Sequence, residues 1–175
     1  MAFAKIVQFL RGAKPGVLAI TGPVGCGKRH AISEAAQQAN VALTHHDLAQ
    51  GGVEWSKLGA QHLTSGGLMR NAHVVSNATA DFLWDFAFVK TTQVNIILVA
   101  DDAGAGMRAS VPIVRIQKLS TDAMTKKLFL ELDWPVEEAV RVARLAKGDW
   151  HQVHAQRRFA CSAAADVDQS NALDV

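Results

Sequence analysis

The fold is decided by the stretch Gly22-Pro23-Val24-Gly25-Cys26-Gly27-Lys28-Arg29. It follows the apolar run 17–21 and precedes residues 29–39, whose composition is typical of a helix. A strand, a glycine-rich turn ending in Gly-Lys and a helix together form a phosphate cradle. The glycines let backbone N–H groups converge, the helix N-terminus favours negative charge, and the lysine reaches the outer phosphates. We therefore predict that these eight residues bind the phosphates of a nucleotide.

The last position of this phosphate loop departs from the usual pattern. Arg29 stands where such a loop has Ser or Thr, whose hydroxyl group ligates Mg²⁺. Glycine-rich turns also occur as plain tight turns without a ligand. The strand before the loop, the helix after it and Lys28 in register favour the phosphate loop over that alternative.

Length and composition set the class of protein. A chain of 175 residues allows one domain of moderate size, or one domain with a small appendage. A net charge of +2 does not by itself indicate a nucleic-acid partner. Cys26 and Cys161 are too few and too badly placed for a disulfide framework or a zinc site. No apolar run approaches the roughly 18 residues of a membrane span. We expect a soluble intracellular protein with no membrane partner.

Apolar runs alternate with helical patterns over the first two thirds of the chain. The runs predict strands, and residues with helical spacing predict the helices between them. This alternation is typical of a doubly wound α/β layer with a parallel sheet of five strands. The aromatic residues of the third helix are expected in the core rather than in a base-stacking surface. The predicted strands are 17–21, 41–44, 72–76, 94–100 and 112–116, and the predicted helices are 2–10, 29–39 and 79–90.

The remaining chain has a different pattern. Ser120 is an N-cap residue for a helix ending near Leu132, and Pro135 begins another that ends near Lys147. A third helix is predicted over 150–164. We therefore expect an α/β domain over 1–117, a small helical domain over 118–164 and a disordered tail over 165–175.

Polar residues follow two of the predicted strands. Asp101 and Asp102 come directly after the strand 94–100, at the end of a parallel sheet where ligands bind. They are the candidates for catalytic acids, although paired acids at strand ends also serve as turn and cap residues. The sequence His45-His46-Asp47 follows the strand 41–44. Neighbours on a strand point to opposite faces, and no third ligand has a useful spacing, so we predict no metal site.

Several of these stretches carry a resemblance to a known family. Residues 17–159 resemble an AAA+ ATPase of the DNA clamp-loader group, most of all the large subunit of replication factor C. The matching stretches are Gly22–Lys28, Leu43–Asp47, Asn95–Asp102, Val114–Ser120 and Lys147–Val153. They correspond to the phosphate loop, the second strand with an acidic turn, the sensor-1 strand, the connection to the lid and the sensor-2 helix.

The resemblance implies a fold, a ligand and partners. The fold is a P-loop NTPase of the AAA+ type, with a parallel five-stranded sheet and a small C-terminal helical lid. ATP is bound between the α/β layer and the lid. The partners are other clamp-loader subunits and the sliding clamp, with DNA contacted through the complex. The location is the nucleus if the source is eukaryotic.

Departures from the family pattern imply weakened or absent ATP hydrolysis. The family's third strand ends in Asp-Glu, which holds Mg²⁺ and polarises water, whereas this chain has Asn77 there and no carboxylate before Asp81. The polar sensor-1 residue becomes Asp101, and His151 is nearest to the expected sensor-2 arginine. Because each lost group contributes roughly tenfold to a thousandfold in rate, little turnover is expected, and a role for Mg²⁺ is doubtful.

Other functions stay open on the sequence. The chain is alternatively a scaffold subunit that keeps the AAA+ shape without using nucleotide. A small nucleoside or nucleotide kinase also starts from a phosphate loop, but the C-terminal helices fit a lid better than a kinase. Lys57, Arg70 and Arg108 are candidates for DNA contact, although scattered basic residues are more often a solvated surface. Ser110 stands where the family carries its arginine finger.

Overall fold

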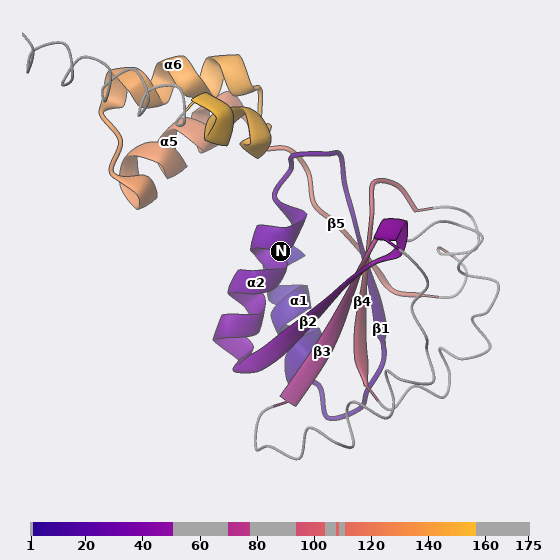
Figure 1. The fold of residues 1–175 in the computed structure, drawn as a ribbon. Coiled ribbons are helices and arrows are strands. Elements are labelled where there is room, and N and C mark those ends of the chain that lie inside the picture. The colour runs from indigo at the N-terminus through magenta and orange to yellow at the C-terminus, as the bar shows by residue number, and fades with distance from the viewer. Residues whose placement is uncertain (1, 51–69, 78–93, 104–107, 109–110, 157–175) are drawn as a thin grey trace, which may run out of the picture. The chain divides into compact units, whose positions relative to one another are not determined.

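The computed structural model describes residues 2–50, 70–77, 94–103, 108 and 111–156 (Figure 1). The chain divides into two compact units. The first unit holds Met1–Pro23 and Lys28–Ile116, and the second holds Val24–Gly27 together with the chain from Gln117 onward. The phosphate loop is thus shared by the two units along the chain.

The first unit is built on a parallel sheet of five strands in the order β2-β3-β4-β1-β5. The strand β1 lies inside the sheet, with β4 on one side and the edge strand β5 on the other. All five of its residues are buried, which explains its uninterrupted apolar sequence. The predicted five-stranded parallel sheet is confirmed. The strands are β1 (Val17–Thr21), β2 (Val41–Asp47), β3 (Arg70–Ser76), β4 (Asn95–Ala100) and β5 (Ile113–Arg115).

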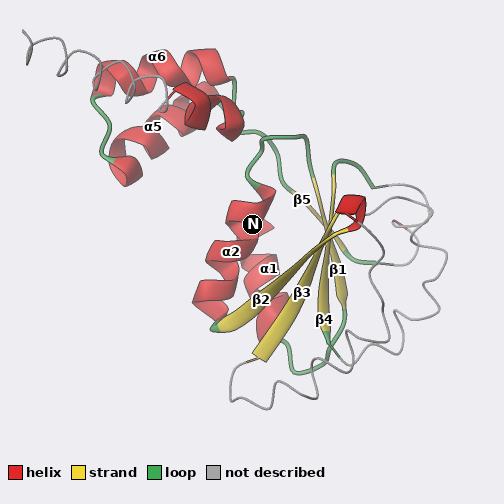
Figure 2. Cartoon of the chain, in the orientation of Figure 1, coloured by secondary structure: helices red, strands yellow, loops and turns green. Residues whose placement is uncertain are grey.

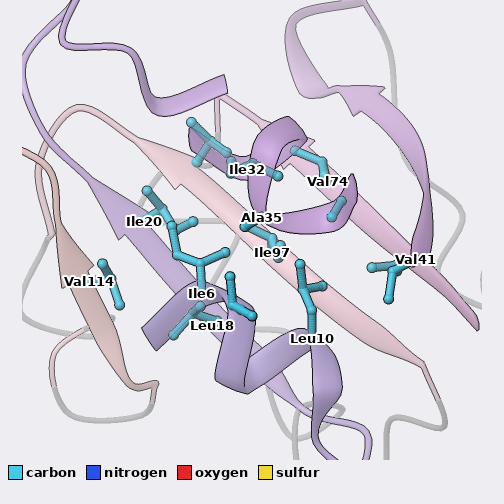
Figure 3. Close-up of a cluster of buried hydrophobic side chains, with 14 residues drawn as sticks. Ile6, Leu10, Leu18, Ile20, Ile32, Ala35, Val41, Val74, Ile97 and Val114 are labelled. Atoms are coloured by element: carbon cyan, nitrogen blue, oxygen red, sulfur yellow. The ribbon is translucent and has the colours of Figure 1, made fainter. Parts of the chain in front are cut away.

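Two helices, α1 (Ala2–Arg11) and α2 (Lys28–Ala39), cover one face of this sheet (Figures 1 and 2). Their apolar side chains meet those of alternate strand residues in one cluster (Figure 3). Ile6 and Leu10 of α1 and Ile32 of α2 are fully buried there. Truncating such a side chain costs about 2–5 kcal/mol, so this packing fixes where α2 begins.

The other face of the sheet has its own apolar cluster. It includes Val17 and Ala19 of β1 and Ile96 and Leu98 of β4. The alternation of these positions with those facing α1 and α2 is the period of a strand. The helix predicted over 79–90 lies outside the described residues.

The strand β2 is longer than the sequence indicates. We predicted a strand over 41–44, but β2 continues through Asp47 and pairs with β3 as far as Ser76. The predicted strand was too short because β3 starts at Arg70 and supplies hydrogen-bonding partners along all of β2. His45 is exposed, whereas the ring of His46 lies 3.0 Å from that of His73 on β3, between Nε2 and Nδ1.

The second unit contains two complete helices, α5 (Thr121–Leu132) and α6 (Val136–Ala146), and helical residues 150–156. Ser120 caps α5 as predicted, with its hydroxyl accepting the Ala123 N–H at 3.2 Å. The helices share a core that includes Met124, Leu128 and Val142. Among the described helices, none is long and apolar enough to cross a membrane.

The histidine pair predicts sensitivity to mild acid. Burial, and then the neighbouring charge of His45, lower the pKa of His46 below its ordinary value of 6.5. The folded state therefore favours neutral His46. As far as this residue is concerned, the free energy of unfolding is highest above about pH 6.5 and decreases as the pH falls below that value. Urea unfolding should give a lower free energy of unfolding at pH 5.5 than at pH 7.5. His46→Gln should reduce this difference, whereas His45→Gln, on the opposite face of β2, should preserve most of it.

Candidate functional site

The phosphate loop joins the end of β1 to the start of α2. Thr21 ends the strand and Lys28 is the first residue of the helix. Gly25 has φ 76° and Gly27 has φ 88°, a backbone conformation that side chains with a Cβ disfavour. The strand, glycine turn and helix that the sequence predicts are therefore present, with the α2 N-terminus following the turn. Such a backbone presents N–H groups to an anion.

The side chain of Lys28 turns back onto the loop. Its Nζ donates to the carbonyl oxygens of Gly22 at 2.5 Å and Pro23 at 3.2 Å. It also forms an ion pair with Oδ1 of Asp101 at 2.8 Å. The Lys28 side chain is 12% exposed, whereas that of Asp101 is 65% exposed. The ammonium group is thus held beside the loop, with a carboxylate on its solvent side.

The two candidate acids have different surroundings. Asp101 lies beside the loop because β4 pairs with β1 in parallel, and the Gly22 N–H donates to the Asp101 carbonyl at 3.3 Å. Asp102 accepts from the N–H of Ala103 at 2.8 Å and pairs with Arg115 at 3.3 Å. Of these two acids, only Asp101 forms an ion pair with Lys28.

Arg29 reaches across the ends of the neighbouring strands. Its Nη2 lies 3.4 Å from the hydroxyl of Ser76, the last residue of β3. Asp47, which ends β2, accepts from the N–H of Ala49 at 3.0 Å and from Nδ2 of Asn77 at 2.6 Å. These two hydrogen bonds, and then the charge of Arg29, lower the pKa of Asp47. A fixed guanidinium, a hydroxyl and a carboxylate therefore share this edge of the sheet.

The residues present do not fit a magnesium ion. The position after Lys28 carries a guanidinium in place of a hydroxyl ligand, and β3 ends in Ser76 followed by Asn77. Across the described ranges, no group of three or more His, Cys, Asp or Glu side chains is placed to hold a metal. Asp81 lies outside those ranges.

The tip of the loop packs within the second unit. The N–H of Trp150 donates to the Gly25 carbonyl at 2.9 Å, and the Asp149 carboxylate lies where a Cβ on Gly25 would be. Burial would raise the pKa of Asp149. The N–H groups of His151 and Gln152, together with Lys118, outweigh it and hold that pKa below its ordinary value. Asp149 is therefore an anion that packs against the loop tip, a contact that the sequence pattern does not indicate.

Other residues singled out from the sequence have structural contacts or lie outside the described part. The N–H of His151 donates to Asp149, and its side chain is exposed. Arg70 donates to the carbonyl of Arg11 at 2.9 Å, and Arg108 to that of Ala103 at 2.8 Å. Lys57 and Ser110 are not among the described residues. The contacts of Arg70 and Arg108 are those of side chains that tie chain segments together.

The comparison with known proteins supports the fold. No family model and no curated protein matches the sequence. Among solved structures, a chain of the Drosophila ORC bound to DNA is similar, with a TM-score of 0.57 at 15% identity. The alignment covers 95% of this chain and 54% of that one, so the chain spans about half the length of its neighbour. The predicted α/β fold with a parallel five-stranded sheet is confirmed.

The loop tip generates a prediction about stability. Gly25→Ala should lower the free energy of unfolding by at least about 1–3 kcal/mol, because a residue with a Cβ is strained at positive φ. The added methyl group would also overlap the Asp149 carboxylate. Gly16→Ala is the matched control, since its Cβ would meet only the Phe9 ring at an ordinary 3.6 Å. Thermal unfolding of both variants measures the difference, and equal melting temperatures would contradict the tight fit at Gly25.

Proposed function

We propose that this chain is a subunit of the AAA+ type that binds a nucleotide at its phosphate loop and hydrolyses it weakly or not at all. The observation that carries the proposal is Lys28, placed at the start of α2 with its Nζ beside the loop carbonyls. Gly22–Gly27 supply backbone amides for the inner phosphates, and Lys28 and Arg29 supply positive charge. ATP and ADP are the ligands that this arrangement suits.

Weak hydrolysis follows from the groups at the strand ends. Phosphoryl transfer depends on positioning and on neutralising the charge spread over the transferred phosphate, with a metal ion as a principal part. Ser76 and Asn77 offer no carboxylate to hold a metal or polarise water. Asp101 and Asp102 are the remaining candidates for catalytic acids, and only Asp101 pairs with Lys28. Nucleotide is therefore expected to be bound and retained rather than turned over.

The cellular role is inferred through the fold. The resemblance to clamp loaders, most of all to the large subunit of replication factor C, supports a role in loading a sliding clamp during DNA replication or repair. The similarity to ORC bound to DNA supports the broader proposal of a subunit in a DNA-associated assembly. In that proposal the helices from Gln117 onward act as the lid, and the partners are similar subunits, a sliding clamp and DNA through the complex.

A scaffold subunit that does not use nucleotide is the alternative. It is favoured by the ion pair that already engages Lys28 with Asp101. An ammonium group with a protein carboxylate as partner has less to gain from a phosphate. Titration with fluorescent ATP and ADP separates the two proposals, because no binding up to millimolar concentration would favour the scaffold.

Lys28→Ala is the first test of the nucleotide site. Binding of fluorescent ADP should weaken by roughly tenfold to a hundredfold, because the variant lacks a charge-assisted hydrogen bond to the phosphates. Lys14→Ala, at an exposed position before β1, should bind as the wild type does. Steady-state phosphate release should stay near background for all three proteins. A wild-type rate typical of an intact AAA+ ATPase, abolished in Lys28→Ala, would show that the prediction of weak turnover is wrong.

The role proposed for Arg29 predicts that nucleotide binding depends little on magnesium. The affinity of the wild type for ADP should change by less than about threefold between buffer with Mg²⁺ and buffer with EDTA, because Arg29 supplies a fixed positive charge. Arg29→Gln should weaken binding in EDTA by about fivefold or more. His30→Gln, which changes the next residue, should not. Strong magnesium dependence of the wild type would contradict the assignment of this role to Arg29.

A further inference from the structure

We propose that the phosphate loop selects nucleotides that end in a β-phosphate over those that end in a γ-phosphate, and that Asp101 is the residue that sets this selectivity. The inference rests on the proposed nucleotide binding and adds the class of ligand. Two observations support it: the ion pair of Lys28 with Asp101, and the positions of the other charged side chains around the loop.

The ion pair occupies the position that an outer phosphate needs. In a phosphate loop the backbone amides cradle the α- and β-phosphates, whereas the lysine reaches the β- and γ-phosphates. Here Oδ1 of Asp101 lies 2.8 Å from the lysine Nζ. A phosphate oxygen that bonds to Nζ must therefore replace this carboxylate or lie directly beside it. The further a nucleotide extends along the lysine, the closer its negative charge comes to Asp101.

The chain keeps Asp101 in this position through its backbone. Asp101 follows β4, which is in register with β1 from Val17 to Thr21, and its carbonyl accepts the Gly22 N–H. The side chain can rotate into solvent, but the main chain holds its Cα at the mouth of the loop. Repulsion of a γ-phosphate is then weakened by solvent but not abolished.

Among the described residues, the positive charges other than Lys28 do not pair with Asp101. Arg29 lies against Ser76, and its charge contributes to lowering the pKa of Asp47 at the ends of β3 and β2. Arg115 pairs with Asp102. The residues at the loop also do not fit a magnesium ion, which elsewhere neutralises the β- and γ-phosphates. The α- and β-phosphates can thus bind the backbone amides of the loop, whereas a γ-phosphate would lie beside the Asp101 carboxylate without a metal ion to neutralise its charge.

The expected selectivity is moderate. ATP carries about one more negative charge than ADP, and Asp101 is 65% exposed, so solvent screens the repulsion. Because of this screening the repulsion stays close to the limit of water for two unit charges a few ångströms apart, so we expect about five- to tenfold weaker binding of ATP than of ADP.

The experiment is a titration of the full chain with ADP and ATP by calorimetry at low ionic strength, with EDTA present so that both nucleotides are free of metal. Wild type, Asp101→Asn and Asp102→Asn are compared. Asp102→Asn is the matched control because it also lacks one carboxylate after β4, yet Asp102 pairs with Arg115 rather than Lys28. Melting temperatures establish that the variants are folded.

The expected result is that wild type and Asp102→Asn bind ADP about five- to tenfold more tightly than ATP, whereas Asp101→Asn binds ATP within about threefold of ADP. Equal or tighter binding of ATP by the wild type would overturn the inference and leave the proposed nucleotide binding intact. The same change of the ratio in both variants would also overturn it. Binding of neither nucleotide would overturn the proposed function and this inference together.

Discussion

The placement of the Lys28 ammonium group beside the phosphate loop depends on the packing of the sheet. Lys28 is the first residue of α2, and that helix is anchored by Ile32 and Ala35 against the buried face of the strands. The carbonyl oxygen that accepts a hydrogen bond from Nζ belongs to Gly22, the residue directly after β1. The distance between the lysine and the loop is therefore set by the core, because a shift of α2 would open the apolar cluster that holds it.

The same packing explains which features the sequence predicts. The strand β1, the loop and α2 are adjacent in the chain, so apolar runs, glycines and a lysine are enough to predict them. The parallel five-stranded sheet follows from the alternation of strands and helices. The length of β2 was not predictable, because it depends on pairing with β3 from outside the local sequence. The position of Asp101 and Asp102 directly after β4 was predictable, because they follow an apolar run in the sequence.

The contacts that modify the site are those between distant parts of the sequence. Lys28 and Asp101 are 73 positions apart, and Arg29 and Ser76 are 47 apart. The sequence shows which residues are charged but does not predict which carboxylate will pair with a given cation. Asp149 shows the same limit, since its carboxylate lies against Gly25 although its sequence context indicates only the start of a helix. Charge pairing depends on a few ångströms of geometry, which no periodicity records.

In the proposed function, nucleotide binding and hydrolysis use separable parts of the molecule. Binding needs backbone amides and a helix N-terminus, which are fixed by glycines at positive φ and by the buried face of α2. Hydrolysis needs side chains at the strand ends, where Asn77 and Asp101 are exposed and make no contribution to the apolar core. Exchange of those side chains leaves the apolar core unchanged, and the local contact that it affects at Asn77, which has φ 60°, is the hydrogen bond to Asp47. A chain with this sheet can therefore keep its phosphate cradle while its chemistry changes, and the residues around the cradle rather than the fold decide what it does with a nucleotide.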